Sequence, residues 1–120
     1  MNSVQEKPQL LEDRTLEFSV EVINFCRSLP KSNINDILCS QLIRSATSIG
    51  ANYAEANNAS SRQDFKNKIF IAKKEAAETR YWLKLAEKVN DGVDISGALD
   101  EISQLIFIFQ KISSTLKNGK

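Results

Sequence analysis

The sequence contains no histidine at all. This absence excludes Ser-His-Asp and Cys-His nucleophiles, HExxH zinc sites, and the Glu-x-x-His ligand pairs that helical bundles use for di-iron centres. Its 4 glycines stand alone, at positions 50, 92, 97 and 119, so a glycine-rich phosphate loop is absent as well. We therefore expect a protein that is not an enzyme and that holds no cofactor and no metal.

Cysteine and long apolar runs are also scarce. Cys26 and Cys39 lie 13 residues apart, without a CxxC motif, which argues against a zinc site or a redox motif. We expect them to be two small buried side chains. No stretch reaches the roughly 18 apolar residues of a membrane span, and the N-terminal segment lacks the apolar core of a signal peptide. The expected location is the cytoplasm, with no membrane partner.

The composition that remains is typical of a folded domain. With 120 residues, of which 42% are hydrophobic and 26% charged, the chain fits a single domain over residues 1–120. The net charge is only +1, but the charges are segregated. Residues 61–90 hold 8 basic and 4 acidic side chains, a balance of +4.

Apolar residues recur at steps of three and four along most of the chain, which predicts amphipathic helices. The predicted ranges are about 9–29, 34–57, 62–90 and 95–117. Short connections make neighbouring helices antiparallel, and their apolar faces must pack on each other. The predicted fold is all-α, an antiparallel up-down-up-down four-helix bundle.

Several local signals set the ends and faces of these helices. Thr15 fills a missing step in the first apolar face, and the second face begins at Ile34. Ser32 and Asn33 are candidate caps for the second helix, and Ser61 with Asp64 approximates a capping box for the third.

The third and fourth helices carry more apolar side chains than one bundle face needs. Phe70, Tyr81 and Trp82 fall outside the main face of the third helix, and Phe107 and Ile108 lie beside that of the fourth. Several such residues on helices whose cores are already supplied indicate a second buried surface. Self-association would provide it.

A polar stripe follows one side of the second helix. Its members recur at steps of three and four: Gln41, Arg44, Ser48, Asn52 and Glu55. One interpretation is a contact with a ligand or RNA, and the other is a hydrogen-bonded seam with a neighbouring helix or subunit.

Small side chains are interleaved with this stripe. Ala46, Gly50 and Ala54 follow each other at a spacing of four residues. Because glycine inside a helix costs roughly 1 kcal/mol relative to alanine, its presence predicts the close approach of another helix.

A basic stripe runs along the third helix, within a narrow sector that flanks the apolar face. It consists of Arg62, Lys66, Lys73, Arg80 and Lys84. Phe70 and Tyr81 lie alongside. Basic side chains near aromatic rings can neutralise phosphates and stack on bases, so this face is the candidate for nucleic-acid binding. The alternative is a solvated face whose lysine stems cover apolar neighbours.

The segment from Gln41 to Ala56 resembles the signature of the four-helix-bundle proteins encoded by intervening sequences within bacterial 23S ribosomal RNA genes. That signature reads roughly Q-x-x-R-A-x-x-S-I-x-x-N-I-A-E-G. It is matched here at Gln41, Arg44, Ser48, Ile49, Asn52, Ala54 and Glu55. Phe65, Ile71-Ala72 and the segment from Leu83 to Ala86 also fit the third helix of that family. The likeness covers about residues 10–117.

This resemblance implies a homopentameric ring of bundles without known catalytic activity. The accessory variability proteins of diversity-generating retroelements are similar in fold, and they pair such a ring with nucleic acid and a reverse transcriptase. Three departures stand out. Tyr53 replaces the usual isoleucine and Ala56 the usual glycine, and Lys74-Glu75 replaces a small Gly-Ser step in the third helix.

Two hypotheses for function follow. The first is a homo-oligomeric scaffold that associates with RNA, or with a nucleic-acid enzyme, through the basic stripe. The second is a protein-only assembly or adaptor module without a nucleic-acid role, which the surplus apolar surface and the near-neutral charge favour.

Overall fold

Four α-helices make up most of the computed structural model, which describes residues 8–118. They are α1 (Pro8–Ser28), α2 (Asn33–Asn57), α3 (Arg62–Val89) and α4 (Ser96–Asn118). Each begins and ends within one residue of its predicted range. The N-terminal residues 1–7, on which the expectation of no signal peptide partly rests, lie outside the described part of the chain. Within that part, no helix is long and apolar enough to cross a membrane.

Hydroxyl side chains cap two of the helices as predicted. The Ser32 Oγ accepts a hydrogen bond from the backbone N–H of Asn35 at 3.0 Å, and the Ser61 Oγ accepts one from that of Asp64, also at 3.0 Å. In the loop between α3 and α4, Gly92 adopts a φ of +77°, a left-handed conformation that suits glycine.

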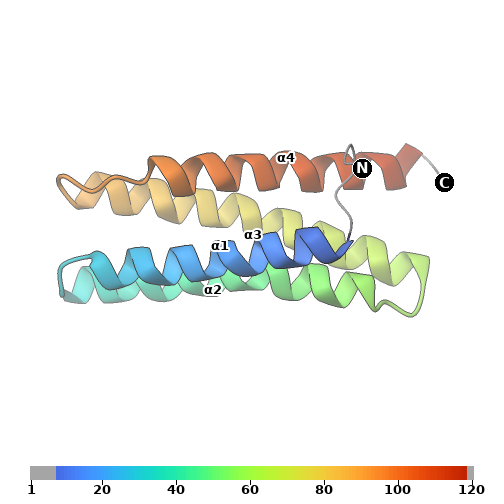
Figure 1. The fold of residues 1–120 in the computed structure, drawn as a ribbon, viewed down its shortest axis with the longest axis horizontal. Coiled ribbons are helices and arrows are strands. Elements are labelled where there is room, and N and C mark those ends of the chain that lie inside the picture. The colour runs from blue at the N-terminus through green and yellow to red at the C-terminus, as the bar shows by residue number, and fades with distance from the viewer. Residues whose placement is uncertain (1–7, 119–120) are drawn as a thin grey trace.

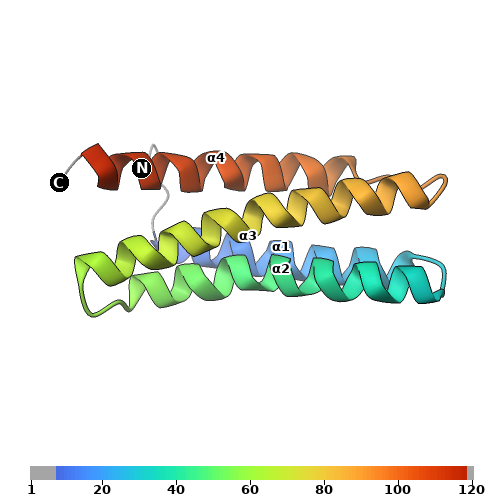
Figure 2. The ribbon, with the colours of Figure 1, turned by 180° about the vertical axis from the view of Figure 1, so that it is seen from behind.

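The helices run alternately up and down, since the connecting loops lie at alternate ends of the molecule (Figure 1). α1 and α2 lie side by side, and α3 runs obliquely from α2 towards α4, as the view from behind shows (Figure 2). The molecule measures 47 × 28 × 21 Å. α2 packs most extensively on α3, and of the four pairs of helices that touch, α1 and α4 have the smallest contact. The predicted all-α up-down-up-down bundle is confirmed.

All four helices contribute to one apolar core. Its largest fully buried side chains are Phe18, Phe109, Leu11, Leu42, Ile49, Ile69, Leu83, Ile102 and Leu105. Tyr53 meets Phe109 edge to face, with ring centroids 5.7 Å apart. Thr15 is buried as expected, and its hydroxyl donates to the carbonyl of Glu12 at 2.9 Å.

The contact between α1 and α2 is close. A Cβ atom added to Gly50 would lie 2.9 Å from the Thr15 Oγ1, so the close approach predicted at Gly50 is present. One turn away, the Ser19 Oγ donates to the carbonyl of Ala46 at 3.5 Å. Cys26 and Cys39 are half-buried, so the expectation that both are buried is not met.

Polar pairs join α2 to α3. The Thr79 hydroxyl donates to the Ser45 Oγ at 2.9 Å in the buried interface. Near the end of the bundle, Asn35 and Asn90 donate to each other's side-chain oxygens at 2.9 and 3.0 Å. This pairing turns Asn35 inward, with an exposed fraction of 7%, and leaves the neighbouring Ile34 63% exposed. The expectation that Ile34 begins the apolar face is therefore wrong.

Charged side chains join α1 to α4. The Arg14 guanidinium donates to both carboxylate oxygens of Glu101, at 2.6 and 3.0 Å, and to Gln104 at 2.8 Å. A groove of about 520 Å³, which we call the acidic groove, is lined by Arg14, Glu17, Phe18, Glu21, Gly97, Asp100 and Glu101. Partial burial and the nearby charge of Glu101 raise the pKa of Glu21 above its ordinary value.

Candidate nucleic-acid interface

The basic stripe of α3 is available for binding. Lys66 and Lys73 are half-buried, and Arg62, Arg80 and Lys84 are exposed. None of the five forms a salt bridge with a described acidic residue. By contrast Lys68, on the flank of α3 that faces α2, pairs with Glu55 at 2.7 Å, and this hydrogen bond raises the pKa of Lys68.

The structure extends the stripe at Lys73 into a groove shared with α4. The groove has a volume of about 730 Å³. Its lining consists of Lys73, Phe107, Gln110, Lys111, Ser113, Ser114, Thr115 and Lys117. We call it the basic groove, because its described lining holds three ammonium groups and no carboxylate.

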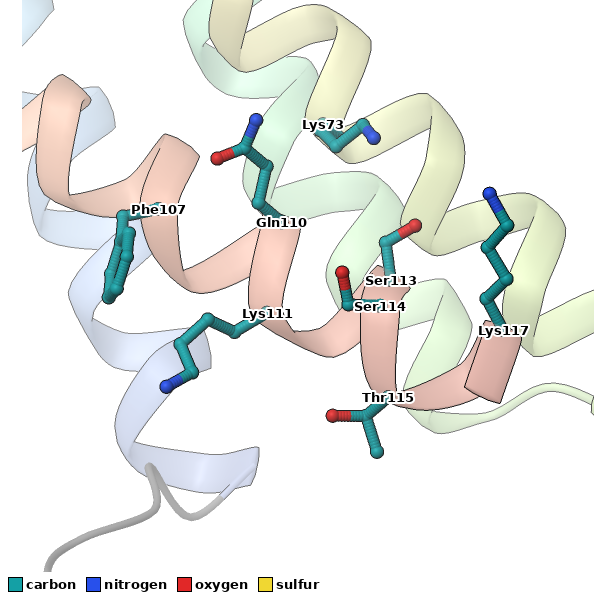
Figure 3. Close-up of a pocket in the computed structure, with 8 residues that line it drawn as sticks. All are labelled: Lys73, Phe107, Gln110, Lys111, Ser113, Ser114, Thr115 and Lys117. Carbon is teal, nitrogen blue, oxygen red and sulfur yellow. The ribbon is translucent and has the colours of Figure 1, made fainter. Parts of the chain in front are cut away.

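The side chains of the basic groove spread over two sides of α4 (Figure 3). Gln110, Ser113 and Lys117 extend towards α3, on whose near side Lys73 lies. Phe107 and Lys111 point away from α3 (Figure 3), and the Lys111 ammonium sits 5.5 Å from the centroid of the Phe107 ring. The donors therefore line a surface along the last turns of α4.

This surface suits an extended anion with flat apolar groups. Ammonium groups attract phosphates, while the serine hydroxyls and the Gln110 amide can donate hydrogen bonds to phosphate or sugar oxygens. The Phe107 ring is 59% exposed and can stack on a base. Phe70, under the Lys74 ammonium at 5.8 Å, and Tyr81 are also more than half exposed.

Not every surplus aromatic residue is free for such a contact. Trp82 is half-buried against the core, and its indole N–H donates to the Glu78 carboxylate at 2.9 Å. Trp82 therefore has a structural role within this chain.

The α4 half of the basic groove was not found from the sequence. Of its residues, the sequence pattern indicates only Phe107, as surplus apolar surface, and not Lys111 or Lys117. A signal did exist, because Lys73 and Lys111 each lie 19 residues from Gly92, and positions equally distant from a tight loop meet on antiparallel helices.

The polar stripe of α2 does not form a continuous seam. Glu55 alone reaches across to α3, through Lys68. The Asn52 amide bonds within α2, to the carbonyl and the hydroxyl of Ser48 at 2.8 and 3.0 Å. Arg44 is exposed, and its guanidinium makes no hydrogen bond or salt bridge to another described residue, while Gln41 is half-buried. Arg44 is thus exposed and free for a contact outside the chain.

Reaction chemistry has little support in the described residues. Between Pro8 and Asn118, no group of three or more histidine, cysteine or carboxylate side chains is placed to hold a metal ion. In the acidic groove, the Glu101 carboxylate is engaged by Arg14. The arrangement defines an all-α bundle with a cationic surface groove.

The chain belongs to the 23S rRNA-intervening sequence protein family, whose model matches residues 11–111. A solved structure from Bacteroides thetaiotaomicron VPI-5482, described as a protein with unknown function from the S23 ribosomal protein family, is 36% identical. The similarity covers 92% of this chain and 100% of that chain, with a TM-score of 0.77. A comparison with curated proteins gives no match.

Proposed function

We propose that the protein is a non-catalytic, cytoplasmic, homo-oligomeric bundle that binds RNA or a ribonucleoprotein through the basic stripe of α3 and the basic groove. The observation that carries this proposal is the convergence of Lys73 with Lys111 and Lys117 in a groove to which no residue between 8 and 118 contributes a carboxylate. Unpaired ammonium groups can displace the counterions that surround a phosphate backbone, and this displacement drives association.

The exposed rings favour single-stranded RNA over a duplex. Splayed bases can stack on Phe107 and Phe70, whereas the faces of the bases in an A-form helix are stacked on each other and cannot meet a side-chain ring. The family description names 23S rRNA, and that of the solved relative names a ribosomal protein family. Both descriptions direct the first test towards RNA.

The test is the affinity for a single-stranded RNA oligonucleotide as a function of salt concentration. Three phosphate contacts give a slope of about −2 for log affinity against log salt. The combined variant Lys73→Glu, Lys111→Glu and Lys117→Glu should lose most of this slope and at least about tenfold in affinity.

A control of equal charge places the same reversals elsewhere. Arg27, Lys31 and Lys88 are exposed and lie outside both the basic stripe and the basic groove. If their combined change to glutamate weakens binding as much as the groove variant, overall charge and not the groove is responsible. If wild-type protein shows no salt-dependent binding, RNA is not the partner.

The second candidate is a protein-only assembly or adaptor module, favoured by apolar surface outside the core. Ile34 and Ile37 at the start of α2 are 63% and 64% exposed, and Val89 at the end of α3 is 50% exposed. The Asn35–Asn90 pair holds these two helix ends together, so the three side chains share one end of the α2–α3 face. A surface of this kind is typical of an interface.

Self-association is part of both candidates, and the family resemblance suggests a pentamer. Sedimentation or light scattering at micromolar concentration measures it directly. Ile34→Lys with Ile37→Lys should dissociate the oligomer, whereas Leu10→Lys, at another position that is 56% exposed, should not. A monomeric wild-type protein would contradict self-association. A wild-type oligomer that does not bind RNA, and whose assembly is unchanged in the groove variant, would favour the protein-only module.

A further inference from the structure

The register of α1 against α2 brings the two cysteines of the chain together. Thr15 lies against Gly50, and Ser19, one turn further along α1, lies against Ala46, one turn back along α2. Two turns beyond Ser19 and Ala46, the same antiparallel register places Cys26 opposite Cys39.

The short connection between α1 and α2 keeps the two helices close together at the end where Cys26 and Cys39 lie. α1 ends at Ser28 and α2 begins at Asn33, and the backbone N–H of Leu29 bonds to the carbonyl of Cys26 at 3.3 Å. Adjacent helices held close by a tight connection can present two Cβ atoms at the separation that a disulfide needs.

The surroundings of the two thiols agree with this placement. Both are half-buried, so a small reagent can reach the pair from solvent. Burial, together with a weaker hydrogen bond to Cys39, raises the pKa of Cys26 to about 12. The Cys26 thiol therefore keeps its proton at neutral pH and has Cys39 as its neighbour.

We propose that Cys26 and Cys39 form a reversible disulfide that joins α1 to α2 when the protein meets a low-molecular-weight disulfide. The site is independent of the basic groove, which Cys26 and Cys39 do not line. The bond would fix the α1–α2 hairpin as one unit.

The reaction proceeds in two exchanges. The Cys39 thiolate attacks one sulfur of the small disulfide, which breaks the S–S bond and releases one small thiolate. Cys26 then gives its proton to solvent, and its thiolate attacks the Cys39 sulfur of the mixed disulfide. The second small thiolate leaves and takes up a proton from solvent. Two electrons pass from the cysteine pair to the small disulfide, which becomes two small thiols. Because Cys26 is protonated, the first attack falls to Cys39.

The test is incubation of the folded full-length protein with glutathione disulfide at neutral pH. Intact mass should fall by two hydrogens, and proteolytic mapping should find the Cys26 and Cys39 peptides linked within one chain. The oxidised protein should melt roughly 10 °C higher than the reduced protein, since the bond closes a short loop in the unfolded chain. Dithiothreitol should reverse both changes.

Serine variants separate the two roles. Cys26→Ser should stop at a mixed disulfide of Cys39 with glutathione, and Cys39→Ser should react far more slowly. Circular dichroism checks that both variants are folded. The proposal is overturned if folded wild-type protein keeps both thiols free, stops at a glutathione adduct, forms only disulfides between chains, or links the cysteines only after denaturation.

Discussion

α1 is joined to its two neighbours in opposite ways. Against α2 it packs through small and hydroxyl side chains, with Gly50 lying directly against Thr15. Against α4 its main polar contact is the salt bridge between Arg14 and Glu101, beside the acidic groove. The bundle is thus tightly packed between α1 and α2 and more open between α1 and α4. α4 is therefore secured mainly by its apolar contact with α3.

This difference also separates the charges of the molecule. The acidic groove lies on the side of α4 that faces α1, whereas Lys73 of the basic groove belongs to α3. An anionic partner is repelled from the first groove and attracted to the second, which orients its approach.

The largest effect is expected in the tightly closed part of the core. Ile49→Ala should lower the free energy of unfolding by about 2 to 5 kcal/mol, because Ile49 is fully buried and its truncation leaves a cavity. Leu16→Ala on α1, at a position 64% exposed, should change it by less than about 0.5 kcal/mol. Urea denaturation measures both values. Similar losses for the two variants would contradict the described core.

A smaller effect is expected at the contact between Gly50 and Thr15. Gly50→Ala gains about 1 kcal/mol in helix propensity, but the new Cβ lies 2.9 Å from the Oγ1 of a buried side chain. We expect a net loss of about 1 kcal/mol in the free energy of unfolding.

A double-mutant cycle isolates this clash. Thr15→Ala removes the Oγ1 and should be less destabilising in the Gly50→Ala background than in the wild type, with a coupling above about 0.5 kcal/mol. If Gly50→Ala stabilises the protein by its propensity alone, α1 and α2 are not held in close contact.

The open contact should be less sensitive. Arg14→Ala should cost about 1 kcal/mol, because it removes a partly buried bidentate pair with Glu101, and the loss should shrink as salt increases. Arg27→Ala, at an exposed position on the same helix, is the matched control. A loss for Arg14→Ala as large as that of Ile49→Ala would show that the α1–α4 contact is part of the main core.

The smallest effect is expected at Glu21. Because its pKa is raised above the ordinary 4.5, the folded protein binds this proton more tightly than the unfolded chain does. Stability therefore falls as pH rises through the window above 4.5. Glu21→Gln should be slightly more stable than wild type at neutral pH and equal to it below about pH 4.

A matched acid tests whether the effect at Glu21 is local. Glu17→Gln removes a charge from the same groove and the same helix. Arg14, Asp100 and Glu101 also face this groove and stay unchanged in both variants. Thermal unfolding measured from pH 4 to pH 8 compares them. An equal change in both variants would assign the effect to net charge and not to Glu21.

The fold could be predicted from the sequence because helical periodicity and hydroxyl caps are local signals. Ser32 and Ser61 mark their helix starts, and Thr15 could be placed inside because the apolar repeat continues on both sides of it. Ile34 was placed wrongly, because at a helix start the burial of Asn35 is decided by a partner far along the chain, Asn90.

The candidate site could be predicted only in part. A repeat along one helix shows which basic residues share a face, and this located Lys73. It does not show which residues of another helix complete a groove, so Lys111 and Lys117 needed the structure. The family signature in α2 was recognised from the sequence, but the split of its polar residues between Lys68, α2 itself and solvent depends on how α3 packs.

The reciprocal amides of Asn35 and Asn90 have a consequence for how the chain avoids wrong pairings. The Asn35 amide also donates to the carbonyl of Pro30 at 2.8 Å, and that of Asn90 to the carbonyl of Ala86 at 2.9 Å, so both donors of each amide are in use. Sliding α3 by one turn along α2 would present leucine or alanine to these amides and strand their hydrogen atoms in an apolar setting. The two asparagines thus favour one register of α3 along α2, because a register shifted by one turn would leave their amide groups buried without partners.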